Sequence, residues 1–132
     1  MEIKISTASG RVPVTVMHVE GNIDSSTYEA FQARAEELIK AGTRDVLVDL
    51  EHAPFVSSAG LRALNSLFNR LRELSPDVGD EEMRQGINAG TYKSPHLKLL
   101  SPSKSSMLAL ENSLFSMFLD VFTDFKTALA SF

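Results

Sequence analysis

Two adjacent serines, Ser57 and Ser58, are the residues whose type and position most readily suggest chemistry. They follow the apolar pair Phe55-Val56 and precede the small pair Ala59-Gly60, at the start of a segment with helical periodicity. A hydroxyl at the beginning of a helix accepts hydrogen bonds from backbone N–H groups that have no acceptor within the helix. One interpretation is therefore an N-cap serine, whose replacement by alanine would cost about 1 kcal/mol of stability.

Phosphorylation is the second interpretation of the same serines. A phosphate adds about two negative charges, which the positive end of a helix dipole stabilises. The added charge and bulk would also repel an acidic partner docked nearby. A serine at the start of a helix can therefore switch an interface while the fold persists, and the residues alone leave both interpretations open.

Other kinds of site lack their sequence patterns. The segment around Ser57 and Ser58 has no Gly-x-Ser-x-Gly elbow, and a hydrolytic triad would need a histidine that folding brings to it. His18, His52 and His96 are far apart and have no second metal ligand at helical or hairpin spacing. The chain also has no cysteine and no glycine-rich phosphate loop. We therefore expect a protein that is not an enzyme and that holds no metal or cofactor.

Length and charge narrow the class of protein further. A chain of 132 residues fits one domain with one hydrophobic core. Its formal net charge of -4 argues against direct binding of nucleic acid, because no excess of cations is present to neutralise phosphates. No apolar run approaches the ~20 residues of a membrane span, and the N-terminal residues lack a secretory pattern. We expect no membrane insertion and a cytoplasmic location.

Hydrophobic periodicity predicts an α/β fold. Alternating apolar residues predict a short strand at Ile3 and Ile5 and further strands over residues 12–20, 45–50, 96–100 and 118–121. Helical spacing predicts four helices, over residues 26–41, 57–74, 101–112 and 124–131, the first with a capping box at Ser26 and Glu29. Strands and helices alternate after the opening pair, so we expect a mixed β-sheet flanked by about four helices. Residues 75–95 are polar and glycine-rich and predict a long surface loop, in which Glu81 to Gln85 could form a helical turn.

The octapeptide from Phe55 to Arg62 resembles the signature of STAS domains, which are named for sulphate transporters and anti-sigma factor antagonists. Residues 57–62 reproduce a frequent variant, Ser-Ser-Ala-Gly-Leu-Arg. Upstream, Glu20 to Asp24 resembles the family's turn before its first helix, and Val46 to Leu50 resembles its central strand. The resemblance covers most of the chain, most strongly residues 12–73. It implies a single STAS domain over residues 1–132, in which residues 75–95 are an inserted surface loop that either carries a partner-specific contact or is a tolerated insertion.

The resemblance to the bacterial anti-sigma factor antagonists implies a phosphorylation-controlled binding protein. In these proteins the serine after the signature aspartate is phosphorylated by an anti-sigma factor serine kinase, and only the unphosphorylated form captures that kinase. Alignment on Gly60-Leu61 places the acceptor at Ser58, with Ser57 in the place of the aspartate and as the alternative acceptor. A serine phosphatase and a second copy of the chain are further candidate partners. The residues implied to bind the partner are Asp24, Ser57, Gly60, Leu61, Arg62 and Asn65.

A different class of function remains open on the sequence. The chain could be a STAS scaffold in a signalling or membrane-associated complex, in which Ser58 is only a helix cap. A sensor of small molecules is a third class, and it would need an enclosed pocket.

Overall fold

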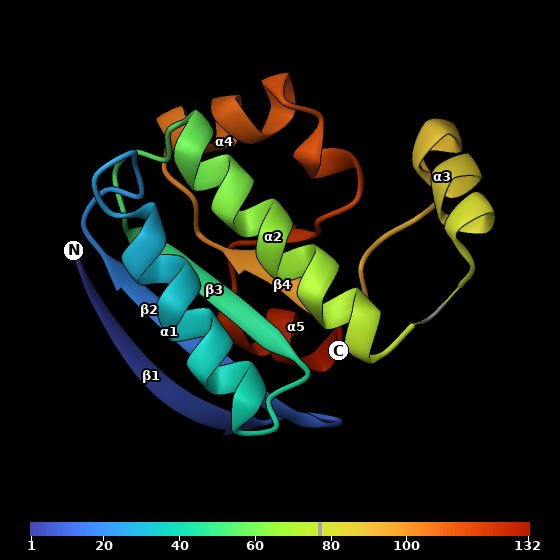
Figure 1. The fold of residues 1–132 in the computed structure, drawn as a ribbon, viewed down its shortest axis with the longest axis horizontal. Helices are drawn as coiled ribbons and strands as arrows, with labels where there is room; N and C mark the ends of the chain where they lie inside the picture. The colour runs from blue at the N-terminus through green and yellow to red at the C-terminus, as the bar shows by residue number, and fades with distance from the viewer. Residues whose placement is uncertain (77) are drawn as a thin grey trace.

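The computed structural model describes residues 1–76 and 78–132. This part of the chain forms one five-stranded sheet with five α-helices and a short 3-10 helix (Figure 1). Strands lie in the order β1-β2-β3-β4-β5, with β1 and β2 antiparallel and the other neighbours parallel, which confirms the predicted mixed sheet. The elements are β1 (Glu2–Ser9), β2 (Pro13–Glu20), α1 (Tyr28–Lys40), β3 (Val46–His52), α2 (Ser58–Leu74), α3 (Asp80–Ala89), β4 (Leu97–Leu100), α4 (Lys104–Asn112), the 3-10 helix (Phe115–Met117), β5 (Val121–Phe122) and α5 (Phe125–Ala130).

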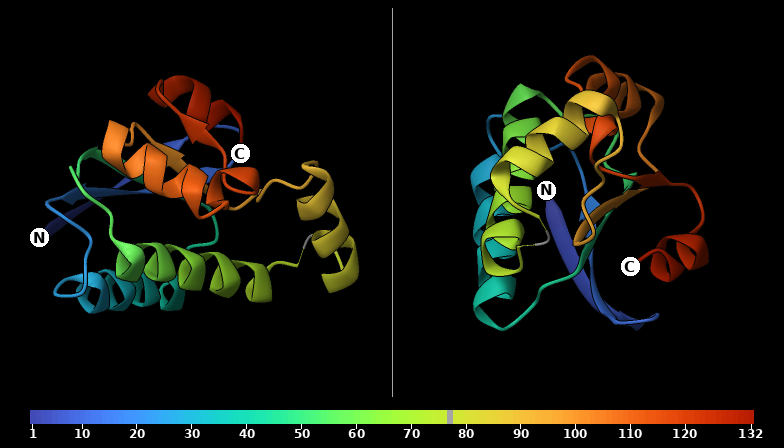
Figure 2. Two further views of the ribbon diagram at one scale, coloured as in Figure 1. Left: turned by 90° about the horizontal axis from the view of Figure 1, so that it is seen from above. Right: turned by 90° about the vertical axis from the view of Figure 1, so that its right-hand side faces the viewer.

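Helices cover the two faces of the sheet unequally. The α1 and α2 helices lie side by side on one face, and the short α5 lies on the other (Figure 2). Met17 and Val19 of β2 point into the larger core beneath α1 and α2, whereas Val14 and Val16 point toward α5. Val46–Leu50 of β3 is buried throughout, as expected for a central strand. None of the helices in the described ranges is long and apolar enough to cross a membrane.

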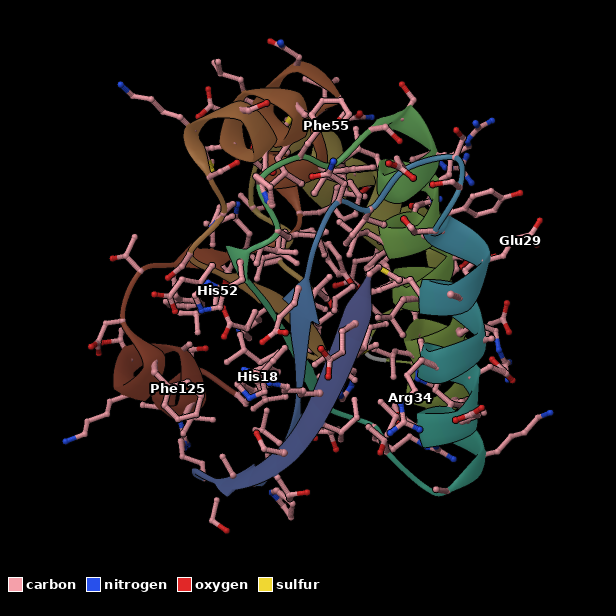
Figure 3. All side chains as sticks on the ribbon, turned by 90° about the vertical axis from the view of Figure 1, so that its left-hand side faces the viewer. His18, Glu29, Arg34, His52, Phe55 and Phe125 are labelled. Carbon is pink, nitrogen blue, oxygen red and sulfur yellow. The ribbon has the colours of Figure 1, made fainter. Side chains whose placement is uncertain are left out.

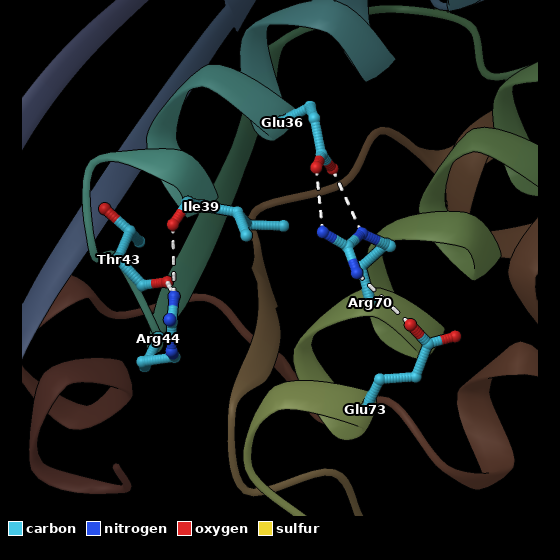
Figure 4. A network of polar contacts seen from close by, with 6 residues as sticks. All are labelled: Glu36, Ile39, Thr43, Arg44, Arg70 and Glu73. Carbon is cyan, nitrogen blue, oxygen red and sulfur yellow. Dashed lines mark hydrogen bonds and ion pairs between the residues drawn. The ribbon is translucent and has the colours of Figure 1, made fainter.

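The two long helices are joined by packing and by an ion pair. Phe31 of α1 and Leu64 of α2 are fully buried in the shared core. Further along both helices, Arg70 donates to both carboxylate oxygens of Glu36, at 2.8 and 3.1 Å (Figure 4). It also donates to Glu73 at 3.2 Å. These side chains are partly exposed, so the bidentate pair fixes the orientation of α1 against α2 more than it adds stability.

The predicted capping box at Ser26 and Glu29 is wrong. The α1 helix begins at Tyr28, and its N-cap residue, Thr27, makes no side-chain capping bond. In a capping box the side chain of Glu29 would accept from the N–H of Ser26. Here Oδ1 of Asp24 accepts from this N–H at 2.9 Å, and from the Ser26 hydroxyl at 2.7 Å. An aspartate that bonds two residues ahead forms an Asx turn, which displaces the start of the helix.

The described residues between 75 and 95 are mostly at the surface but are more regular than predicted. They include α3, a ten-residue helix with no buried residue, in place of the expected turn. Three acidic residues lie in its first turn, where they interact favourably with the positive end of the helix dipole. Gly90 adopts the left-handed conformation and ends the helix. Tyr92 then returns to the core and packs edge-on against Phe68, with ring centroids 6.4 Å apart. That the segment is an insertion stays a prediction.

The last strand is shorter and later than predicted, because β5 consists of Val121 and Phe122 only. Phe118 and Leu119, which the alternating pattern assigned to a strand, are buried core residues that precede it. The ring of Phe118 lies 4.9 Å from that of Phe68, centroid to centroid. An apolar run can thus indicate burial without a strand.

A backbone clasp fixes the start of α2. Ile23, between β2 and α1, donates its N–H to the carbonyl of Phe55 at 3.0 Å, and its carbonyl accepts from the N–H of Ser57 at 2.9 Å. These bonds form an isolated parallel bridge between Ile23 and Val56. We call the pair of segments joined in this way, residues 21–24 and 55–57, the clasp. It continues the pairing of β2 with β3 beyond the ends of both strands.

The clasp requires glycine at position 60. A Cβ added to Gly60 would collide with the carbonyl oxygen of Ile23 and would lie 2.9 Å from Cγ1 of Val56. Gly60→Ala should therefore lower the free energy of unfolding by about 1–3 kcal/mol, although alanine is the better helix former. Urea denaturation measures this loss.

Gly79→Ala is the matched control, because a Cβ at position 79 meets no heavy atom within 4 Å. Gly79 is the N-cap residue of α3, where alanine is less favoured than glycine, so this substitution should cost no more than about 1 kcal/mol. Equal effects of the two substitutions would contradict the close contact at the clasp.

Candidate functional site

Ser57 is the N-cap residue of α2. Its backbone is extended, and its Oγ accepts from the N–H of Gly60 at 3.3 Å. Its own N–H is held by Ile23 in the clasp. The capping role therefore belongs to Ser57, and the alternative in which Ser58 serves as the cap is wrong by one residue.

Ser58 is the first residue of α2, and its side chain is exposed. Its hydroxyl makes no hydrogen bond to any of the residues that the structure describes. The N–H groups of Ser58 and Ala59 belong to the first turn, where no carbonyl of the helix can accept from them. A free hydroxyl thus stands at the positive end of a seventeen-residue helix.

A cleft of about 360 Å³ opens beside the two serines. The loop before α2 and its first turn form one wall, and the end of α4 forms the other. Ser103, the N-cap residue of α4, ties the start of that helix to the loop before α2, because its hydroxyl donates to the carbonyl of Pro54 at 2.9 Å. The lining residues are Phe55, Val56, Ser57, Ser58 and Leu61 from the first wall, with Ala109, Asn112 and Ser113 from the second.

Exposed apolar side chains belong to the cleft or directly precede or follow its lining residues in the chain. Phe55 remains 46% exposed, and Figure 3 shows it at the end of the molecule where α2 begins. On and just after α4, Leu108 and Leu114 are 57% and 60% exposed. Residues of α4 were not among the predicted contacts, because about fifty positions separate them from Ser58 and no local pattern relates the two segments.

The other predicted contact residues are distributed around the start of α2. Asp24 is half-buried directly after the clasp residue Ile23, and Leu61 lines the cleft. Arg62 is exposed and makes no ion pair with the described part of the chain, and Asn65 lies half-buried about one turn further along α2. Gly60 is buried under the clasp, so it shapes this surface from within. Their role in binding a partner stays a prediction.

Asp24 supplies a fixed negative charge beside these residues. Hydrogen bonds from the hydroxyl and the N–H of Ser26 lower the pKa of Asp24 below its ordinary value, and the Thr27 hydroxyl adds to this at 3.2 Å. The carboxylate is therefore ionised at neutral pH and held in one orientation.

The three histidines do not gather into one site. His18 bonds Asp49 at 2.9 Å, and His96 bonds Asp45 at 2.8 Å. Within residues 1–76 and 78–132, no group of three histidine or carboxylate side chains is arranged to hold a metal ion.

The division of roles between the two serines predicts unequal effects on stability. Ser57→Ala removes the cap of α2 and should cost about 1 kcal/mol of unfolding free energy. Ser58→Ala removes an exposed, unbonded hydroxyl and should cost less than about 0.5 kcal/mol. Urea denaturation of both variants tests this, and a larger loss for Ser58→Ala would contradict the assignment of the cap.

The Asp24 turn predicts a pH dependence. Because the folded pKa is lowered, the hydrogen bonds of Asp24 stabilise the fold above the ordinary aspartate pKa of about 3.9, and this contribution is lost as the pH falls through the lower folded value. A titration followed by NMR should give a pKa for Asp24 below the ordinary value, and Ser26→Ala should raise it. Ser25→Ala, at an exposed neighbour, is the control and should leave it unchanged. A pKa that does not respond to Ser26→Ala would refute this account of the turn.

Solved structures with a similar fold include three proteins whose sequences are only distantly similar. A Thermotoga maritima protein, described provisionally as an anti-sigma factor antagonist, is 10% identical with a TM-score of 0.71, and the match covers 96% of this chain and 90% of that chain. An anti-sigma factor antagonist from Mycobacterium paratuberculosis is 15% identical with a TM-score of 0.68, over 98% and 93% of the two chains. The anti-sigma factor antagonist SpoIIAA in its unphosphorylated form is 14% identical with a TM-score of 0.68, over 96% and 93%. The phosphorylated form of SpoIIAA, from Bacillus, is 13% identical with a TM-score of 0.61, over 96% of each chain.

At these identities the structural similarity establishes the fold, and the family is established by sequence. Comparison with curated proteins gives no significant match. The family model of the STAS domain matches residues 6–78, which is more than half of the 132 residues and includes both serines and the clasp. The chain belongs to the STAS domain family.

Proposed function

We propose that this protein is an anti-sigma factor antagonist that captures an anti-sigma factor serine kinase while Ser58 is unphosphorylated, and releases it when Ser58 is phosphorylated. The kinase supplies ATP, Mg²⁺ and the catalytic groups, and this chain supplies the acceptor hydroxyl and the docking surface. The cytoplasm is the place of action in this proposal, since the kinase needs ATP.

The observation that carries the proposal is the state of the Ser58 hydroxyl. It is exposed, it makes no bond within the described residues, and it lies at the edge of an apolar cleft. Because Ser57 caps α2, a phosphate on Ser58 would break no hydrogen bond of the fold. Modification can therefore change the surface while the domain remains folded.

Ser57 is the less suitable acceptor. Its Oγ is engaged with the N–H of Gly60, and its side chain is only half-exposed. Aspartate and serine are both favoured at N-cap positions, so serine in the place of the signature aspartate keeps the capping function and removes one charge beside the acceptor. The cap at position 57 supports the proposal that position 58 is the switch.

The electrostatics of the site favour a change of affinity on phosphorylation. The unmodified surface combines a neutral hydroxyl with the apolar side chains of Phe55 and Leu61. A phosphate would add about two negative charges at the start of α2, and the segment that the clasp pairs with this region already carries the ionised Asp24. A partner shaped for the unmodified cleft would then face uncompensated charge and the loss of apolar contact.

The comparisons support the proposal at the level of the fold and of the family. SpoIIAA has been solved in an unphosphorylated and a phosphorylated form, and this chain has the fold of both. Sequence similarity to SpoIIAA is low, so the assignment of Ser58 rests on the signature residues and on the geometry of this chain.

The proposal predicts opposite behaviour of two variants in a binding experiment with a purified anti-sigma factor serine kinase from the same organism. Ser58→Ala should bind the kinase at least as tightly as the unmodified chain. Ser58→Glu should bind at least about tenfold more weakly, which corresponds to about 1.4 kcal/mol. Isothermal titration calorimetry measures both affinities.

Ser66→Glu is the matched control for the added charge, since Ser66 is also exposed on α2 but eight positions further along the helix. It should bind like the unmodified chain. If Ser58→Ala and Ser58→Glu bind equally well, the switch is refuted and a STAS scaffold becomes the better description.

A further inference from the structure

Three polar residues meet on the sheet face that α1 and α2 do not cover. In the β1–β2 pair, Lys4 lies opposite His18 and Ser6 lies opposite Val16, so Ser6 is the diagonal neighbour of His18. In the β2–β3 pair, His18 lies directly opposite Asp49. Because side chains alternate along a strand, Ser6, His18 and Asp49 project from the same face. Figure 3 shows His18 on the side of the sheet away from α1.

Hydrogen bonds join the three side chains in one chain. The Nδ1 atom of His18 lies 2.9 Å from Oδ2 of Asp49, and Nε2 lies 2.8 Å from the Oγ atom of Ser6. A carboxylate only accepts, so Nδ1 carries a proton, and in the neutral form of the imidazole Nε2 is then the acceptor. In that form Ser6 donates its hydroxyl proton to His18.

Burial decreases along this chain from the acid to the hydroxyl. Asp49 is only 9% exposed, and its other oxygen, Oδ1, accepts from the N–H of Glu51 at 3.0 Å. The side chain of His18 is about one-third exposed, and Ser6 is exposed. The carboxylate thus fixes the tautomer and orientation of the imidazole, and the hydroxyl is accessible to a reagent from solvent.

We propose that Ser6 is a nucleophile activated by His18 and Asp49, and that it accepts an acyl group from an activated ester or thioester. The Oγ atom attacks the acyl carbonyl while its proton passes to Nε2 of His18. The bond between the acyl carbon and the leaving oxygen or sulfur then breaks, and the leaving group takes the proton from His18. The products are an O-acyl serine and the free alcohol or thiol, and Asp49 stabilises the imidazolium between the two steps.

The position of Ser6 determines the kind of reaction. None of the three clefts beside α2, between α1 and α2, or at the start of β3 includes Ser6 or His18. Ser6 is exposed on the edge strand β1, so its hydroxyl receives an acyl group presented at the surface, and the expected result is a modification of that strand. This reaction uses no residue of the Ser58 site, so its test is independent of the test of the proposed switch.

Acetylation by p-nitrophenyl acetate tests the proposal on the full chain. Peptide mapping by mass spectrometry should find acetyl-Ser6 forming faster than acetyl-Ser9, a serine of the same strand that has no histidine partner within the described residues. His18→Gln should slow the acetylation of Ser6 at least about tenfold, since a general base contributes ~10²–10⁴ in enzymes. Asp49→Asn should also slow the acetylation of Ser6.

Circular dichroism establishes that each variant is folded. If His18→Gln does not fold, the comparison of Ser6 with Ser9 in the unmodified protein decides alone. Acetylation of Ser6 no faster than that of Ser9 would overturn the proposal. A rate at Ser6 that is unchanged in folded His18→Gln would also overturn it and would leave the three residues as a network that ties the strands together.

Discussion

The backbone clasp at Ile23 is the contact on which the geometry of the Ser58 site depends. Its two hydrogen bonds, to Phe55 and Ser57, hold the chain before α1 against the chain before α2 at the ends of two parallel strands. Side-chain atoms at position 60 would prevent this approach, so the first turn of α2 must carry glycine. The clasp holds the segment that carries Asp24 against the loop that leads into α2. Packing thus accounts for the conformation of the signature segment, and the exposed hydroxyl of Ser58 takes no part in that packing.

The two serines have separate physical roles because they differ by one position at a helix boundary. Ser57 has the extended backbone of an N-cap and returns its hydroxyl to the N–H of Gly60. Ser58 has entered the helix, so its hydroxyl points outward and bonds no described residue. A phosphate at Ser58 would gain from the helix dipole without removing the cap. The proposed switch requires this combination of a stable helix start and a changeable surface.

Periodicity in the sequence predicted the elements that build the sheet, and it failed where tertiary contacts decide. The pattern of Val46–Leu50 identified the central strand, and the four predicted helices are all present, with α3 as a fifth helix where no more than a helical turn was predicted. Gly86 and Gly90 suggested a loop in the segment where α3 forms, and the acidic first turn of α3 was the available signal for a helix. The bond from Ser103 to Pro54, which ties α4 to the loop before α2, spans 49 positions, and no local pattern contains it. The chain of Ser6, His18 and Asp49 depends on strand register in the same way.

Phosphopeptide mapping of the protein isolated from its native cells, under growth and under stress, is the most direct test of the central claim. The peptide that contains Ser57 and Ser58 would be fragmented so that the phosphate is assigned to one of the two hydroxyls. The account predicts phosphate on Ser58, with an occupancy that changes between the two conditions, and none on the capping Ser57. A phosphate on Ser57, or an unmodified Ser58 under every condition, would contradict it.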